Sequence, residues 1–257
     1  MSMIVEDKAG ESEVLVRIKN LTKIYDGSDK KAVDDLSLEV RSGDVFGFIG
    51  RNGAGKSTTI KCLTGQLPFS GGEISVCGHD INERPIEAKR SIGFVSDDHA
   101  AYEHMTGRQY VNFIADLFSV GNERDARIEY LVGKFDLGAD FDRKISAYSH
   151  GTKQKVCIVA SLVHEPPVWV LDEPLTGLDV AMTRIVKETM ISHAKAGNAV
   201  FFSSHNLDAV ERICTRAAII SRGKILDIID LSDFRKNNGG TLEDHFFFLT
   251  GEDDETV

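Results

Sequence analysis

One stretch of this chain, residues 50–58 with the sequence GRNGAGKST, constrains its fold more than any other feature. The stretch fits the pattern G-x-x-x-x-G-K-[ST] of a phosphate-binding loop (P-loop). An apolar run at residues 45–49 precedes it and predicts a buried strand, and a helical stretch at residues 59–64 follows it. In this strand–loop–helix context the pattern indicates a phosphate site and not an ordinary glycine turn.

Each residue type in the loop suits one part of phosphate binding. The glycines let backbone N–H groups point at phosphate oxygens, and the N-terminus of the next helix adds its positive dipole end. The Lys56 ammonium can reach the β- and γ-phosphates, and the Ser57 hydroxyl can ligate Mg²⁺. We predict that a nucleoside triphosphate is bound by Gly50, Asn52, Gly53, Ala54, Gly55, Lys56, Ser57 and Thr58.

Length and composition limit the remaining possibilities. The 257 residues suffice for one large α/β domain with subdivisions or for two small domains. No run approaches the roughly 18 apolar residues of a membrane span, and residues 1–13 lack the apolar core of a signal peptide. The four cysteines form no C-x-x-C pair, which disfavours a zinc site or a disulfide framework and fits a reducing cytosol.

The net charge of −10 argues against nonspecific nucleic-acid binding, which needs a cationic surface, so we expect no nucleic-acid partner. Part of the acidity lies in residues 252–255, which we expect to form a solvated, frayed end.

Hydrophobic periodicity divides the chain into segments of different structure. Residues 14–18, 33–40 and 72–77 have strand patterns and predict a small antiparallel layer around the P-loop. Helical spacing within residues 110–117 and 128–135 predicts a mostly helical insertion at about residues 97–162.

After the insertion, helix and strand patterns alternate from residue 168 to residue 221. This alternation predicts a largely parallel sheet with its ligand at the carboxyl ends of the strands. A break at residues 237–240 precedes a last short helix at residues 241–249.

Two adjacent carboxylates, Asp172 and Glu173, end the apolar strand at residues 168–171. Beside a P-loop, Asp172 can hold Mg²⁺ while Glu173 orients or deprotonates the water that attacks the γ-phosphate. One group serves the metal and the other the nucleophile, because a carboxylate neutralised by Mg²⁺ is a poor base. His205 follows the strand at residues 199–203, on the edge where the ligand should lie, so its N–H can contact the γ-phosphate. Lys56, Glu173 and His205 are therefore the candidate catalytic residues.

Residues 148–155 join a good N-cap, Ser149, to an apolar helix. The free N–H groups behind this cap form an anion site. Read alone, the segment is only a capped helix.

Together, these motifs make the chain similar to the nucleotide-binding subunit of an ATP-binding cassette (ABC) transporter, from about residue 14 to residue 250. Residues 50–58 match the Walker A loop, and residues 168–174 match Walker B with its catalytic glutamate, Glu173. Residues 149–153 match the family signature, usually S-G-G-Q. The resemblance implies that Ser149 and Gly151 contact phosphate.

Three further positions fit the same family. Residues 176–179 match the D-loop, which ends at Asp179, and His205 matches the switch histidine. Tyr25 matches the aromatic residue that stacks on adenine. The resemblance therefore adds Tyr25 and Asp179 to the nucleotide-binding residues and implies ATP with Mg²⁺ as the ligands.

The implied fold is α/β: a P-loop NTPase (RecA-like) core with a mostly parallel sheet, an antiparallel β subdomain and a helical subdomain insertion. One domain then covers residues 1–250. The antiparallel layer takes up about residues 14–45 and 72–80, the core about residues 45–96 and 163–225, and the insertion about residues 97–162. Residues 226–257 would add a C-terminal strand, a helix and the acidic tail.

In this family two cassettes face each other head to tail, so the P-loop of one and the signature helix of the other hold each ATP. The resemblance implies an ATPase subunit that drives a separate integral-membrane permease from the cytoplasmic face of the membrane. The partner cassette is either a second copy or a different chain. The lysine-bearing signature and the ending at residues 241–246 resemble a bacterial exporter branch that handles drugs, peptides or polysaccharides.

The sequence departs from the family pattern in three places. Arg51 replaces a proline in the P-loop, where mainly backbone contributes, and His150 and Thr152 replace a glycine and the glutamine of the signature. Asp97 stands where the family carries a glutamine that touches Mg²⁺ and relays to the membrane partner. A carboxylate can still bind the metal, so Ser57, Asp172 and Asp97 are the candidate metal ligands.

Other classes of protein remain open at this stage. A soluble ABC protein acting in translation or DNA repair usually has two cassettes or long coiled-coil insertions, which this chain lacks. A GTPase is disfavoured because no N-K-x-D sequence for guanine recognition occurs. A purely structural P-loop protein would not need both Glu173 and His205.

Overall fold

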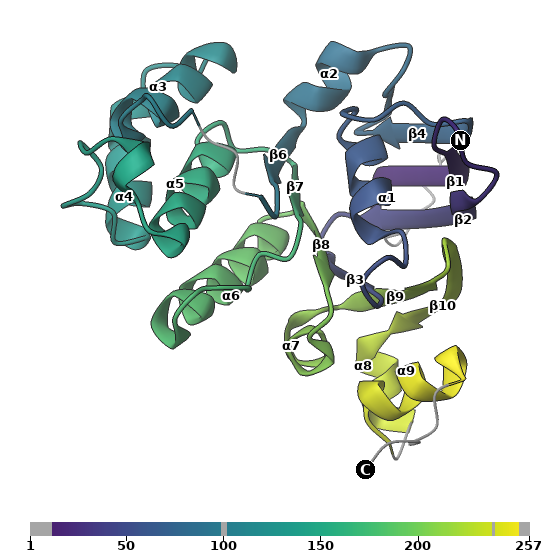
Figure 1. The fold of residues 1–257 in the computed structure, drawn as a ribbon. Coiled ribbons are helices and arrows are strands. Elements are labelled where there is room, and N and C mark those ends of the chain that lie inside the picture. Colours follow the sequence, from purple (N-terminus) through teal and green to yellow (C-terminus); the bar gives the residue numbers. More distant parts are fainter. Residues whose placement is uncertain (1–11, 99–101, 238–239, 252–257) are drawn as a thin grey trace, which may run out of the picture.

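The computed structural model describes residues 12–98, 102–237 and 240–251, which form two sheets and the helices around them (Figure 1). The smaller sheet is antiparallel throughout. Burial alternates along its second strand, as the period-2 pattern predicts, with Leu36, Leu38 and Val40 inside. The strands of this sheet, in spatial order, are β2 (Lys31–Arg41), β1 (Val14–Ile24), β4 (Gly71–Val76) and β5 (His79–Asp80).

The larger sheet is parallel except at one edge, which confirms the predicted α/β fold class. Its central strands are buried over their whole length, because helices or the smaller sheet cover both of their faces. The spatial order is β10 (Lys224–Asp230), β9 (Arg216–Ser221), β3 (Val45–Ile49), β8 (Ala199–Ser204), β7 (Val168–Leu171) and β6 (Ile92–Val95), with β10 antiparallel to β9.

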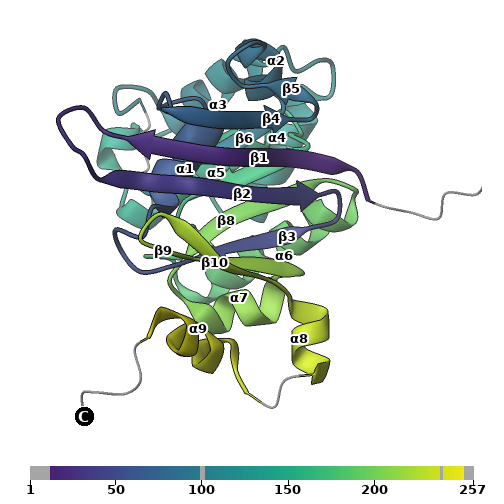
Figure 2. The same ribbon diagram turned by 90° about the vertical axis from the view of Figure 1, so that its right-hand side faces the viewer.

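Three helices gather on the side of β6 and β7 away from the smaller sheet, in the predicted helical insertion (Figure 1). They are α3 (Gly107–Leu117), α4 (Arg124–Lys134) and α5 (His150–Leu162). Figure 2 shows the smaller sheet spread over one side of the molecule and the C-terminal helices below β10. The remaining helices are α1 (Lys56–Leu63), α2 (Pro85–Arg90), α6 (Val180–Lys195), α7 (Leu207–Ile213), α8 (Leu231–Asn237) and α9 (Leu242–Thr250).

Helix α1 begins at Lys56, earlier than the predicted start at residue 59. Gly55 precedes the helix and has φ of 112°, a left-handed conformation that glycine adopts readily. The loop therefore ends at Gly55, and the helix begins at Lys56. The side chains at residues 56–58 therefore project from the first turn of a helix and not from a loop.

The register of the parallel strands brings their carboxyl ends together. Ile49 of β3 pairs with Ser204 of β8, and Leu171 of β7 pairs with Phe202 of β8. The residues that follow these pairs therefore emerge side by side at one edge of the sheet. This edge carries the P-loop, the carboxylate pair and His205.

Two of the sequence predictions fall mainly outside the described residues. The acidic end at residues 252–255 lies wholly outside them, and the N-terminal segment at residues 1–13 lies mostly outside them. In the part of the chain that the structure does describe, no helix is both long and apolar enough to cross a bilayer.

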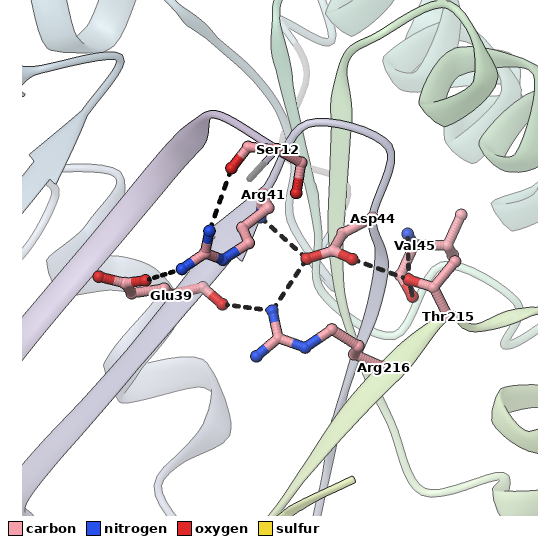
Figure 3. A network of polar contacts seen from close by, with 7 residues as sticks. All are labelled: Ser12, Glu39, Arg41, Asp44, Val45, Thr215 and Arg216. Atoms are coloured by element: carbon pink, nitrogen blue, oxygen red, sulfur yellow. Dashed lines mark hydrogen bonds and ion pairs between the residues drawn. The ribbon is translucent and has the colours of Figure 1, made fainter. Parts of the chain in front are cut away.

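A buried carboxylate, Asp44, fastens the two sheets to each other (Figure 3). Its Oδ2 accepts hydrogen bonds from the Arg41 backbone N–H at 2.9 Å and from Arg216 Nη1 at 3.1 Å. Its Oδ1 accepts one from the Thr215 hydroxyl at 3.0 Å. The Arg216 guanidinium also donates to the Glu39 carbonyl at 3.1 Å, so residues of β2 and β9 meet at one carboxylate.

Replacing Asp44 by Ala should lower the free energy of unfolding by about 2–3 kcal/mol, because the half-buried Arg216 loses its charge partner. Urea unfolding of the purified protein measures this change. Asp208→Ala, which breaks an exposed pair with Arg212 on α7, is the matched control and should cost less than about 0.5 kcal/mol. Equal stabilities for the two variants would contradict this role of Asp44.

Candidate active site

The P-loop is shaped by glycines at positions that no side chain suits. Gly53 and Gly55 have φ of 79° and 112°, which only glycine adopts without strain. A Cβ at Gly50 would lie 2.5 Å from the Ile220 carbonyl oxygen of β9. The loop can therefore pass close to the sheet and turn its backbone toward a ligand, as the sequence pattern predicts.

Lys56 lies inside this loop with 6% of its side chain exposed. Its ammonium donates hydrogen bonds to the Gly50 carbonyl at 2.6 Å and the Arg51 carbonyl at 3.3 Å. Its Nζ also lies 3.5 Å from Glu173 Oε1. The predicted phosphate-binding lysine and the predicted catalytic carboxylate are thus brought into direct contact.

Glu173 is held from both sides. His205 Nδ1 lies 2.9 Å from its second carboxylate oxygen, Oε2, so Glu173 bridges His205 and Lys56. Its backbone has φ of 50°, an uncommon conformation for a residue with a side chain. Such backbone strain persists where the surroundings fix it and clusters at functional sites.

Ser203 is a site residue that the sequence prediction missed. Its buried hydroxyl donates to Asp172 Oδ1 at 2.6 Å and accepts from the Glu173 N–H at 2.9 Å. One side chain therefore fixes both neighbouring acidic residues. The available signal was a pair of serines, Ser203 and Ser204, that end an otherwise apolar strand just before His205.

The three candidate metal ligands line one cavity of about 380 Å³. Ser57 comes from α1, Asp172 follows β7, and Asp97 follows β6. Oxygen donors of this kind suit Mg²⁺, which keeps several waters and takes one or two carboxylates together with substrate phosphates. The donor set therefore fits a metal held jointly with a triphosphate. Among the described residues, no group of three or more His, Cys, Asp or Glu is placed to hold a metal ion.

Tyr25, the residue predicted to stack on adenine, lies next to the start of α1. Its hydroxyl is 3.1 Å from the Thr58 hydroxyl at the start of α1, and 43% of the residue is exposed. Lys23 Nζ lies 5.2 Å from the centre of the ring. The structure thus joins Tyr25 to the P-loop across a large separation in sequence.

The predicted signature residues pack against the predicted D-loop residues at the start of α5. Ser149 caps α5 and accepts from the Thr152 N–H at 3.2 Å, which confirms the predicted N-cap. A Cβ built on Gly177 would lie 2.9 Å from the His150 ring, so the two segments pack closely. Gln154 Nε2 donates to the Pro174 carbonyl at 2.6 Å.

Asp179 caps α6 by accepting from the Met182 N–H at 2.7 Å. Strands β6 and β7 stand between α5 and α1 in Figure 1. The contacts of Ser149 and Asp179 given above tie them to their own helices. The structure therefore assembles the P-loop, Tyr25, the carboxylates and His205, whereas the signature forms a second, separate group.

A glycine loop between a buried strand and a helix, a buried lysine and an acidic pair at the next strand ends define a P-loop NTPase. A family profile described as ABC transporter matches residues 33–176. The chain belongs to the ABC transporter family, as one of its ATP-binding cassettes, and this family consists of ATPases.

Relatives with known names support this assignment. An uncharacterized ABC transporter ATP-binding protein, YhcH, of Bacillus subtilis is 34% identical over 247 residues, which cover 95% of this chain and 78% of YhcH. ATP-binding cassette sub-family A member 7 of Rattus norvegicus is 36% identical over 218 residues, 84% of this chain. The match covers only 10% of that rat protein, so the chain corresponds to a small part of it.

Solved structures show the same fold. One described as the ATP-binding subunit of an ABC transporter has a TM-score of 0.87 and 29% identity, and the match covers 92% of this chain and 99% of that one. A cassette described as dimeric, in a post-hydrolysis state with ADP and phosphate, has a TM-score of 0.78. Its 21% identity, over 84% of this chain and 98% of that one, supports the fold alone.

Replacing Ser203 by Ala should lower kcat for ATP hydrolysis by about tenfold or more and raise the Mg²⁺ concentration for half-maximal rate. The reason is that Asp172 and the Glu173 backbone both lose the hydroxyl that orients them. Steady-state ATPase assays over a Mg²⁺ series measure both effects.

Ser204→Ala is the control, because Ser204 is also buried, at 4% exposed, and its hydroxyl accepts from the Asn206 N–H, whereas it is Ser203 that binds Asp172. It should keep the parental kcat and Mg²⁺ dependence. Equal activity losses in the two variants would show that Ser203 acts only through general packing.

Proposed function

We propose that this chain binds and hydrolyses MgATP to power transport, in the direction of export, through a separate integral-membrane permease. It does so by ATP-driven dimerisation of two cassettes at the cytoplasmic face of the membrane. The single observation that carries the proposal is that Glu173 stands between Lys56 and His205 at the P-loop, while the start of the signature helix packs against the D-loop. Each chain then contributes the P-loop half of one ATP site and the signature half of the other.

The first half supplies the chemistry of hydrolysis. Glu173 orients the attacking water and accepts its proton, and His205, hydrogen-bonded to Oε2, fixes the direction of that carboxylate. Lys56 exchanges the Gly50 carbonyl for phosphate oxygens, which lets it stabilise charge on the β- and γ-phosphates. Mg²⁺, held by Ser57, Asp172 and Asp97, would neutralise phosphate charge. Ser203 keeps Asp172 turned toward that position.

The second half supplies N–H donors. Helix α5 starts at His150 behind the Ser149 cap, and the positive end of a helix dipole favours an anion at such an N-terminus. These donors complete the site of a second cassette only while a γ-phosphate is present. ATP then favours the dimer and hydrolysis releases it, because the two states differ in affinity for the nucleotide.

A cavity of about 230 Å³ between α1, β6 and the helical insertion suits the permease. Its walls include the apolar side chains of Phe94, Tyr110 and Ile114. The exposed Tyr102 packs against the Tyr110 ring, and the exposed Phe113 packs against the Tyr102 ring. A short amphipathic helix fits such a groove. Tyr110 and Phe94 also line the Asp97 cavity, so a docked helix would adjoin the candidate metal ligands. The export direction rests on the sequence resemblance alone.

Glu173→Gln should reduce ATP turnover by at least about 100-fold, because the amide accepts no proton from water. It should also leave an ATP-bound dimer in gel filtration that is absent without nucleotide. Glu188→Gln, which changes an exposed glutamate on α6, serves as the matched control and should hydrolyse ATP as the parent does. Normal turnover by the Glu173 variant would remove Glu173 from the mechanism.

A further inference from the structure

An almost fully buried lysine, Lys23, lies against the residue that is predicted to stack on adenine. Lys23 is 8% exposed and belongs to β1, the strand that ends one residue before Tyr25. Its Nζ lies 5.2 Å from the centre of the Tyr25 ring. Among the described residues, no carboxylate forms an ion pair with this ammonium, so the face of the ring is its charge partner.

A buried ammonium of this kind is unusual, because lysine is rarely buried unless a partner compensates for the loss of water. Lys56, the other buried lysine of the described ranges, has two carbonyls and the Glu173 carboxylate as partners. The partner that the structure gives to Lys23 is the Tyr25 ring. We therefore look for the role of Lys23 in what the ring does.

The Tyr25 ring is held at two points. Its hydroxyl is 3.1 Å from the Thr58 hydroxyl of α1, and Lys23 covers one of its faces. Burial raises the pKa of Cys62, one turn further along α1, to about 11, and the nearby Lys23 charge partly offsets this rise. Because Lys23 is buried whereas Tyr25 is 43% exposed, the ammonium covers the inner face of the ring and leaves the outer face open.

A cation on one face of an aromatic ring changes what the other face can bind. The faces of such rings carry partial negative charge, so two rings that overlap fully repel each other. An ammonium draws electron density toward itself, which weakens this repulsion on the opposite face. It also holds the ring in one orientation, so that less side-chain freedom is lost when a base binds.

We propose that Lys23 is a positioning residue for the nucleotide base, with its ammonium on the inner face of the Tyr25 ring and the base on the outer face. Lys23 then acts through the ring and touches neither the base nor the phosphates. A stacked base removes water from the ring, which strengthens the contact between Lys23 and Tyr25 in turn. This inference rests on the proposed ATP site, but it requires neither dimerisation nor a permease.

The test is calorimetric titration with two ligands in the presence of Mg²⁺. ADP carries the base and is not a substrate for hydrolysis, whereas pyrophosphate lacks the base. Lys23→Met keeps the length of the side chain and removes its charge. It should raise the Kd for ADP by about fivefold and leave the Kd for pyrophosphate within about twofold of the parental value. Equal losses for the two ligands would show that Lys23 acts on the phosphates, and would overturn the inference.

Lys19→Met is the matched control, because Lys19 is an exposed lysine of the same strand. It changes the net charge of the protein by the same amount, so it should leave both dissociation constants unaltered. A fivefold loss of ADP affinity in this control as well would show that any lysine on β1 acts through long-range charge, and would contradict a specific role of Lys23.

A Tyr25→Leu background separates the lysine from the ring. Tyr25→Leu should itself weaken ADP binding, because the stacking surface is lost. Adding Lys23→Met to it should raise the Kd for ADP no further, since the ammonium has no ring to act through. A second fivefold loss in this background would show that Lys23 acts independently of Tyr25, and would also overturn the inference.

The proposed function and this inference fail in different ways. If the parent protein binds neither ADP nor pyrophosphate, the proposed function falls and this inference falls with it. If the parent binds both ligands and Lys23→Met binds ADP as tightly as the parent does, the inference alone is overturned.

Discussion

The parallel pairing of β3, β8 and β7 is the constraint on which the rest of the structure depends. Three buried strands end at one edge, and hydrogen-bonded register decides which residues meet there. A slip of one residue in β8 would move Ser203 away from Asp172 and His205 away from Glu173. Because these strands are buried along their whole length, such a slip would also repack the core on both faces.

The polar groups at this edge of the sheet satisfy one another. Lys56 is surrounded by two carbonyls and the Glu173 carboxylate, and Glu173 is shared with His205. A buried ammonium or carboxylate without such partners would be costly. In the proposed mechanism, phosphate oxygens replace the partners of Lys56 when ATP binds, which leaves Glu173 available to water. The same side chains thus stabilise the fold and carry out the proposed chemistry.

The sequence predicted those parts of the site that depend on local pattern. The strand at residues 168–171 could be predicted because an apolar run ends sharply at two carboxylates. The helix cap at Ser149 could be predicted because an N-cap is a local signal. The role of Ser203 could not be predicted in this way, because it comes from a hydrogen bond to Asp172, which follows a different strand. Likewise the last helix was predicted, but its place beside Gly50 and His205 depends on contacts with α7 that no local pattern encodes.

The central claim is that one chain holds two halves of different ATP sites, since the P-loop group and the signature group are apart. The most direct measurement is ATPase activity per subunit across a wide range of protein concentrations, with the oligomeric state recorded at each point. The account predicts low activity per subunit in the monomer and a rise to a plateau as dimers form. Activity per subunit that stays constant while the protein remains monomeric would contradict it.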